Sequence, residues 1–399
     1  MINEHTEKRK TMQSILIGLL LILLIASIVY ACREYFSIGV DDFTRRYRES
    51  KYVLHGISPF DIIYGNKEVV SSIGELPRNS GYPSWSMVIG ILTNFAFLPE
   101  NIAYLLTGAV MVLCIALVGI VLYRFGKQKK WSEEQCLLQT LCGLCISGLW
   151  TGLSWLNFGS VIGVLLFLFV LCEEKYPYVA GILLGISSIK PVLAAPFFLA
   201  VLLRKNWKCF LSATVIPLVA MLICFALTKV SPLTMLAQMG AEGNTYWNNS
   251  FFANFNLLLG YGLSTKTCNF LSTIFGIGLA LLLWVWMHPV KNKYVYYSIP
   301  AVISGFWMYS QEHDRSVQLI LLVALFLYLY QDKGTLKRTA CFFIFTTICY
   351  RRFLIFFFEN FTNVEVVFQA VDMLFDLSLI CALIMLIVHE KDKLKYEPH

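Results

Sequence analysis

The sequence predicts an all-α, polytopic membrane protein with about twelve transmembrane helices, and three observations support this. Hydrophobic residues make up 57% of the chain and charged residues only 14%, whereas soluble domains carry about 25% charged residues. Apolar runs long enough to cross a bilayer as helices recur along the chain. The net charge of +7 comes from basic residues that are spread over short loops. This distribution is typical of the loops of membrane proteins rather than of a nucleic-acid-binding surface. No repeat or linker divides the chain, so residues 1–399 are expected to form one domain.

The first predicted span is the apolar run from Ile15 to Ala31. It is long and no small-residue cleavage site follows it, so we expect a retained helix rather than a signal peptide. Eleven further spans are predicted at 84–98, 101–124, 135–152, 156–172, 178–203, 209–228, 268–287, 295–310, 316–331, 338–355 and 365–388. An even number of spans puts both termini on one side of the cell membrane, and their basic residues indicate that this side is cytoplasmic.

One conflict leaves two topologies open. The basic cluster at 124–130 is typical of a cytoplasmic loop, but simple alternation of the spans places it outside. The conflict disappears if 84–98 is re-entrant and 178–203 consists of two short segments broken at Lys190-Pro191. Proline lacks a backbone donor and disfavours helical geometry in the residue before it, so a break at this position is physically reasonable.

Two longer polar stretches, residues 33–83 and 229–267, are predicted to be outer loops in either topology. The first contains a predicted interfacial helix from Asp42 to His55, with apolar residues gathered on one face and basic residues elsewhere. The second is polar and aromatic. It includes Tyr246 and Trp247, whose rings could close over a sugar by stacking or simply anchor the loop at the interface.

A pair of adjacent carboxylates, Asp41 and Asp42, follows the first span by about ten residues and precedes a basic stretch that includes Arg45 and Arg48. A carboxylate just outside the membrane can serve as a general base. Aspartate is also favoured at the N-cap of a helix, and such a helix is predicted to begin near this point. The two roles can coexist, and we favour Asp42 over Asp41 as the base.

Two further groups are candidates for chemistry. Lys190 lies inside an apolar run, where an uncompensated ammonium is costly, so we expect it to reach water or to pair with an anion; a lysine that snorkels at a helix end is the alternative. His313 and Arg315 lie in the segment 310–315, which is predicted to face outside. They can bind a phosphate or supply a proton, or they belong to an ordinary polar loop.

Metal and redox chemistry are not expected. The twelve cysteines fall mostly within apolar runs, and the pair Cys142 and Cys145 has no second pair to complete a metal site. Small buried hydrophobes are the usual role for such cysteines.

The segment 42–60 resembles the first-loop signature of glycosyltransferase family 87, within the GT-C superfamily. Asp42, Phe43, Gly56, Pro59 and Phe60 match that signature in type and spacing. Later stretches are similar to family motifs in the same order: Tyr82-Pro83, Leu98-Pro99, Asn157-Phe158-Gly159, Gly181, Gly185, Lys190-Pro191 and His313. The resemblance covers about residues 15–330.

Three positions depart from the family pattern. Ser84 stands where a second proline is usual, Ser310-Gln311 replaces a serine-proline pair, and the glutamine expected before the glycine near Asn157 is absent. These departures bear on the identity of the sugar more than on the class of reaction.

The resemblance implies a GT-C-type bundle and a transferase that moves a sugar, usually mannose, from a polyprenyl-phosphate donor to an acceptor hydroxyl at the outer face, with inversion. The acceptor would be a lipid, a glycan or a glycolipid. Asp42 would be the base, without a metal or other cofactor, because Asp41 and Asp42 are adjacent rather than spaced as in metal-using members. The expected donor-phosphate ligands are Lys190, His313, Arg315, Arg45 and Arg48, and the expected sugar or acceptor contacts are Tyr82, Asn157, Tyr246 and Trp247.

Other functions predict different features. A transporter should place ionisable residues deep in several spans and show repeat symmetry, but here these residues cluster at the outer ends apart from Lys190. In a lipid-sugar flippase or a scaffold, Asp42 would have no catalytic consequence. A polymerase or ligase of the O-antigen type usually has its large outer loop late in the chain. For the transferase, we expect Asp42 to line the largest cavity, with at least two of the five basic residues pointing into it.

Overall fold

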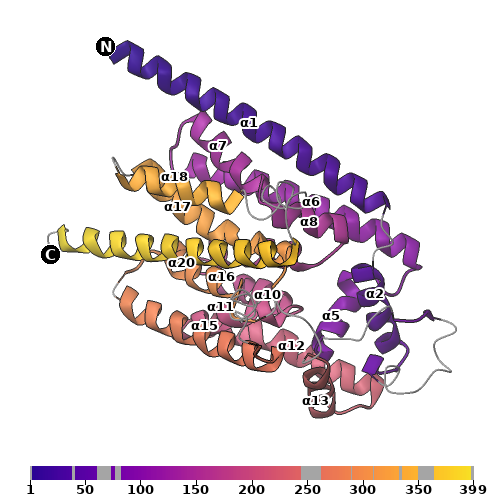
Figure 1. Cartoon of the computed structure of the whole chain (residues 1–399). Helices are drawn as coiled ribbons and strands as arrows, with labels where there is room; N and C mark the ends of the chain where they lie inside the picture. The colour runs from indigo at the N-terminus through magenta and orange to yellow at the C-terminus, as the bar shows by residue number, and fades with distance from the viewer. Residues whose placement is uncertain are drawn as a thin grey trace.

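The computed structural model describes residues 2–37, 41–60, 73–76, 82–243, 262–288, 290–308, 310–331, 335–348 and 364–396. Helices dominate this part of the chain, and it contains no β-strand, which confirms the all-α class. Figure 1 shows most helices running along one common direction as a bundle. The start of α1 and the end of α20 lie toward one end of this bundle, and α2 and α5 lie at the other.

The helices differ widely in length. In chain order they are α1 (Ile2–Ser37), α2 (Asp41–Leu54), α5 (Ser84–Thr93), α6 (Glu100–Gln128), α7 (Glu133–Leu144), α8 (Ser147–Trp155), α9 (Gly159–Cys172), α10 (Pro177–Ser187), α11 (Pro191–Leu203), α12 (Trp207–Thr228), α13 (Pro232–Gly243), α15 (Thr265–Met287), α16 (Lys293–Ile303), η2 (Glu312–Gln318), α17 (Leu319–Gln331), α18 (Thr335–Ile348) and α20 (Val364–Tyr396).

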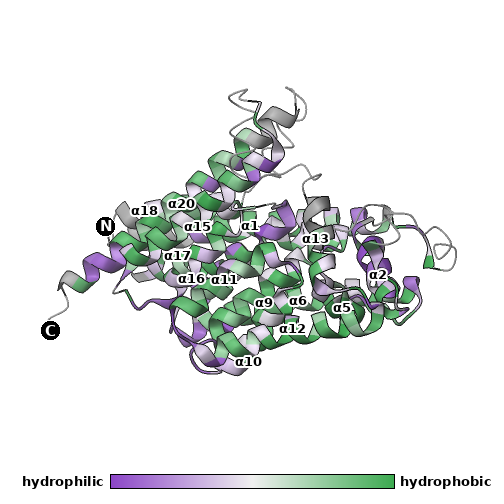
Figure 2. Ribbon diagram, turned by 90° about the horizontal axis from the view of Figure 1, so that it is seen from below, coloured by the Kyte–Doolittle hydropathy of each residue, from purple (hydrophilic) through white to green (hydrophobic). Residues whose placement is uncertain are grey.

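Six helical segments in the described part of the chain are long and apolar enough to cross a membrane: 11–36, 100–128, 207–228, 265–287, 312–330 and 370–394. The bent pair α7 and α8, with an angle of 42° between them, would be a seventh. Apolar residues cover much of the helices seen in Figure 2, as in membrane spans. The protein is therefore a multi-pass membrane protein in which long spans alternate with shorter apolar helices.

The segment predicted at 178–203 is two helices, not one. α10 ends at Ser187 and α11 begins at Pro191, so the broken arrangement is correct. Proline at the first position of α11 explains the break, because its ring cannot continue the preceding helix but fits a helix start.

The segment 84–98 is too short to cross as a helix, since α5 ends at Thr93 after 10 residues. Hydrogen bonds fasten both ends of this segment, one of them to α2. The Tyr47 hydroxyl of α2 donates to the Leu98 carbonyl at 2.6 Å. At the other end, Trp85 and Ser86 donate to the carbonyls of Ser188 and Ile189, at the break between α10 and α11.

Helix breaks therefore meet beside α2. The α8–α9 break, the α10–α11 break and the turn before η2 bring irregular backbone into the bundle, and η2 contacts both α8 and α9. Within a membrane protein, such backbone is tolerated where protein surrounds it or where it lines a cavity. The polar side chains carried by these breaks form the candidate site.

Candidate active site

Asp42 lies in the first turn of α2, and two neighbours hold its carboxylate. Asn157 Nδ2 donates to Asp42 Oδ2 at 2.8 Å. Arg45 Nη2, one helical turn further along, lies 3.5 Å from Asp42 Oδ1. The Asp42 side chain remains 24% exposed. The carboxylate is thus oriented by the protein and still reachable from outside it.

The break between α8 and α9 fixes the orientation of Asn157. α8 ends at Trp155, and the φ of 44° at its C-cap, Leu156, turns the chain. The Asn157 backbone N–H donates to the Gly152 carbonyl at 2.9 Å. The Asn157 side-chain oxygen accepts the Gly159 N–H at 2.9 Å, which satisfies one of the free donors at the start of α9. Because the Asn157 amide oxygen is bound to the Gly159 N–H, the amide nitrogen is the group that faces Asp42 and donates to it.

The environment keeps Asp42 ionised. Burial raises the pKa of this carboxyl, but the charges of Arg45 and Arg46 and the hydrogen bond from Asn157 help to lower the pKa below its ordinary value. At neutral pH the side chain is therefore a carboxylate, the form that can accept a proton.

A second polar group lies deeper in the bundle. Lys190 Nζ is 2.5 Å from Asp314 Oδ1 and 3.2 Å from His313 Nε2, and all three side chains are buried. The other Asp314 oxygen accepts the Gln311 N–H at 3.0 Å. Lys190 is thus compensated by an anion, as expected for an ammonium at this position, and it does not snorkel. His313 belongs to this group and also lies close enough to Asp42 to influence its ionisation.

A glycine at the start of α9 makes this packing possible. A Cβ at Gly159 would overlap Asp314 Oδ1 and lie 2.6 Å from His313 Cδ2. The Ser316 hydroxyl also donates to the Gly159 carbonyl at 3.0 Å. Because Gly159 has no side chain, the polar residues of η2 can pack closely against the α8–α9 break.

The other predicted site residues lie elsewhere or outside the described residues. Arg315 Nη1 is 2.5 Å from Asp376 Oδ1 of α20, and its guanidinium lies 5.3 Å from the Phe375 ring. Arg48 donates to the Glu75 carbonyl at 2.6 Å and lies 3.4 Å from the Glu100 carboxylate. The Asp41 side chain, Tyr246 and Trp247 fall outside the described residues.

Two residues of the site were not among those predicted, Arg46 and Asp314. Arg46 donates to the Tyr82 hydroxyl, and its guanidinium lies 4.2 Å from the Tyr82 ring and 5.9 Å from the Phe158 ring. Helical spacing could have identified it, because residues three and four positions after Asp42 share its face, whereas Arg48 is six positions away. Asp314 had no comparable local signal.

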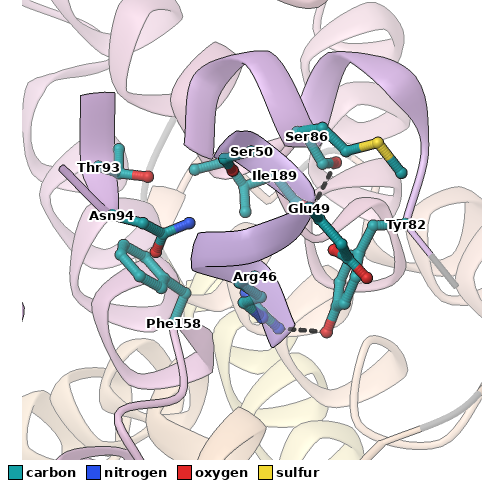
Figure 3. Close-up of a pocket in the computed structure, with 10 residues that line it drawn as sticks. Arg46, Glu49, Ser50, Tyr82, Ser86, Thr93, Asn94, Phe158 and Ile189 are labelled. Atoms are coloured by element: carbon teal, nitrogen blue, oxygen red, sulfur yellow. Dashed lines mark hydrogen bonds between the residues drawn. The ribbon is translucent and has the colours of Figure 1, made fainter. Parts of the chain in front are cut away.

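A small cleft lies next to these residues (Figure 3). Its walls are Arg46, Glu49, Ser50, Tyr82, Ser86, Met87, Thr93, Asn94, Phe158 and Ile189. Asp42 and the five predicted basic residues are not among these walls. Asp42 lies one helical turn away, with Arg45 and Asn157 against its carboxylate, and Arg46 forms the wall instead.

The chain matches one known protein family. The model of glycosyltransferase family 87 matches residues 83–310, more than half of the chain. No curated protein and no solved structure matches the chain. The matched region includes Asn157 and Lys190, begins after Asp42 and ends shortly before His313. This chain, a multi-pass membrane protein, therefore belongs to glycosyltransferase family 87.

Proposed function

We propose that the protein transfers a sugar, with mannose as the expected unit, from a polyprenyl-phosphate donor to an acceptor hydroxyl, with inversion at the anomeric carbon. The observation that carries this proposal is the Asp42 carboxylate, held by Asn157 and ionised beside Arg45, His313 and Arg46. Such a group at the mouth of a polar site suits removal of a proton from a hydroxyl.

The reaction would be a direct displacement. The acceptor oxygen forms a bond to the anomeric carbon while the bond from that carbon to the phosphate oxygen breaks. The acceptor proton passes to Asp42, and the electron pair of the broken bond leaves with the polyprenyl phosphate. One displacement of this kind inverts the anomeric configuration. It needs a base on one side of the sugar and stabilisation of the leaving phosphate on the other.

Basic side chains beside Asp42 are the proposed partners of the phosphate. Arg45 and Arg46 lie on the same face of α2 as Asp42, and Lys190 and His313 form the buried group next to it. Among the described residues, Arg46 makes no ion pair and donates to the neutral hydroxyl of Tyr82, so its charge suits an incoming anion. Because Arg48 and Arg315 contact the carboxylates of Glu100 and Asp376, we propose a structural role for these two residues instead.

Solvation determines where the lipid tail and the charged head of the donor lie. A long polyprenyl tail stays in the bilayer, whereas its charged head requires paired cations at the interface. We propose that α2 lies at the outer interface, that the reaction takes place there, and that both termini are cytoplasmic, in line with their basic sequences.

The test is transfer by the purified protein from a panel of labelled polyprenyl-phosphate hexoses to lipid, glycan and glycolipid acceptors. We expect one donor of this class to be used and the product to carry the anomeric configuration opposite to that of the donor. Transfer from nucleotide sugars alone would contradict the donor class, and retention of configuration would contradict direct displacement.

A further inference from the structure

A buried ion pair between Arg315 and Asp376 joins η2 to α20, the last helix of the described chain. Arg315 Nη1 lies 2.5 Å from Asp376 Oδ1, and the two side chains are 3% and 0% exposed. Asp376 belongs to the segment 370–394, which is long and apolar enough to cross a membrane. Ionisable residues are rare inside membrane spans because they are costly there, and those that occur usually serve a function.

Stability alone does not account for a buried ion pair of this kind. Taking two charges out of water costs about as much free energy as their attraction returns, and apolar residues of similar volume stabilise a protein as well or better. An arginine and a carboxylate do, however, attract each other in a defined geometry. This pair therefore fixes the position of η2, since Arg315 is the next residue after Asp314 and the second after His313.

The two faces of η2 contact different neighbours. In a 3₁₀-helix, residues three positions apart share a face. His313 and Ser316 share the face toward the α8–α9 break, where the Ser316 hydroxyl donates to the Gly159 carbonyl at 3.0 Å. Arg315 and Gln318 share the face toward α16 and α20, where Gln318 Nε2 donates to a carbonyl of α16 at 3.1 Å. Both faces thus hold η2 in place.

Neighbouring residues also confine the guanidinium of Arg315. A Cβ on Gly305, just after α16, would overlap Arg315 Nη1, so the absence of a side chain there leaves room for the ion pair. The guanidinium lies 5.3 Å from the ring of Phe375. The helix that carries Asp376 packs on α16, α17 and α18. Because α20 is itself packed in the bundle, its carboxylate offers η2 a fixed anchor.

The position of η2 in turn determines the surroundings of Lys190. Lys190 Nζ lies 2.5 Å from Asp314 Oδ1 and 3.2 Å from His313 Nε2, and both of these partners belong to η2. We propose that Arg315 and Asp376 are positioning residues, which hold η2 so that Lys190 and His313 stay beside the donor phosphate. The phosphate in this inference rests on the function proposed above. Both η2 and α20 lie after the residues that the family model matches.

The first experiment removes the charges and keeps the packing. In the double variant Arg315→Met with Asp376→Leu, two apolar side chains replace the ion pair. The melting temperature should stay at the wild-type value or rise, because such replacements are often neutral or stabilising. The kcat for transfer, measured with whichever labelled sugar donor the wild type uses, should nevertheless fall about 10–100-fold, since a misplacement of about 1 Å can cost about 10²-fold.

A matched control removes an ion pair at the other end of α9. Arg204 Nη1 lies 3.4 Å from Glu173 Oε2, and Glu173 follows the last residue of α9, whereas Gly159 at its start contacts η2. Arg204→Met with Glu173→Met should change kcat by less than about twofold, because sites more than about 10 Å apart are usually independent. A fall equal to that of the Arg315 and Asp376 variant would overturn the inference.

The second experiment tests whether the ion pair acts through η2. The two apolar replacements are added to a protein that already carries Lys190→Met and Asp314→Asn, in which the buried group is dismantled. Single-turnover transfer should then fall by less than about twofold more, because residues that act through one group have non-additive effects. A further loss as large as in the wild-type background would show that the pair does not act by positioning this group.

A single replacement keeps the inference testable if the double variant does not fold. Asp376→Asn keeps the shape of the side chain and an acceptor oxygen, and it should lower kcat about fivefold, as a neutral acceptor in place of a charged one implies. Wild-type kcat in a folded variant at either test would overturn the positioning role. If wild type uses a donor without polyprenyl phosphate and the variants still lose kcat, the proposed donor fails and the positioning of η2 stands.

Discussion

Asn157 and Asp42, 115 residues apart in the chain, are joined by a hydrogen bond of 2.8 Å from the Asn157 amide nitrogen to the Asp42 carboxylate. The oxygen of the same amide accepts the Gly159 N–H at the start of α9. One side chain therefore ties the interfacial helix α2 to a helix break inside the bundle. Since Asn157 cannot rotate without losing a backbone partner, it holds the carboxylate in one orientation.

The first prediction concerns the pH dependence of Asn157→Leu. The Asn157 hydrogen bond favours the charged form of Asp42, so its loss should raise the pKa of Asp42. The base is lost as pH falls through that pKa, and the acidic limb of kcat/KM should move to higher pH in the variant. A pH profile of the purified enzymes measures this. An unchanged limb with normal melting behaviour would mean that Asp42 does not control the rate.

The second prediction is that Asp42→Asn abolishes transfer while donor binding persists. Asparagine keeps the shape of the side chain but cannot take a proton, and loss of a general base costs about 10²–10⁴-fold in rate. Single-turnover transfer and binding of a donor analogue separate the two effects. More than about a tenth of wild-type activity would reject the assignment, since even the smallest usual loss is larger.

Local patterns in the sequence predicted most of the helices and part of the site. Apolar runs indicated the membrane helices, and the Lys190-Pro191 pair indicated the break between α10 and α11, because both features act within a few residues. The partner of Lys190 could not be predicted from a local sequence pattern. Asp314 lies 124 residues away, and the contact depends on how η2 packs on Gly159.

The arginines of α2 show a different limit of prediction from sequence. A basic stretch beside an acid was evident, but composition alone did not say which cations face Asp42. Helical spacing favours Arg45 and Arg46 over Arg48, and the structure directs Arg48 to Glu100. The cleft depends on the approach of α2 to α5, where a Cβ on Gly90 would overlap Ser50 Oγ. A long-range contact of this kind leaves no periodic signal.

The third prediction separates structure from chemistry at Lys190. Lys190→Met alone should destabilise the protein by about 3–5 kcal/mol, because it leaves Asp314 buried without its cation. Adding Asp314→Asn removes the stranded charge and should restore much of the melting temperature. Transfer from the phosphate-linked donor should stay low in the double variant. Recovery of activity together with stability would show that Lys190 has only a structural role.

The fourth prediction compares two arginines of one helix. Arg46→Gln should lower kcat/KM about 10–100-fold, as loss of about 1.5–3 kcal/mol of hydrogen bonding to a charged group implies. Arg48→Gln is the matched control and should cost less than about threefold, because its partly exposed pair with Glu100 lies outside the proposed site and such pairs are worth about 0–1 kcal/mol. Equal losses in the two variants would remove Arg46 from the site.

The fifth prediction concerns which side of the membrane carries the reaction. His55, just after α2, and Lys129, just after α6, are both exposed and lie beyond helix ends that Figure 1 places at opposite ends of the bundle. In a background without the twelve native cysteines, His55→Cys should react with a membrane-impermeant thiol reagent on intact cells. Lys129→Cys should react only after permeabilisation, because the basic cluster around it is expected to be cytoplasmic. Both variants must retain transfer activity, which shows that the labelled protein is folded. The reverse labelling pattern would place Asp42 and its neighbours on the cytoplasmic side, where the donor's sugar would have to be presented from the inner leaflet.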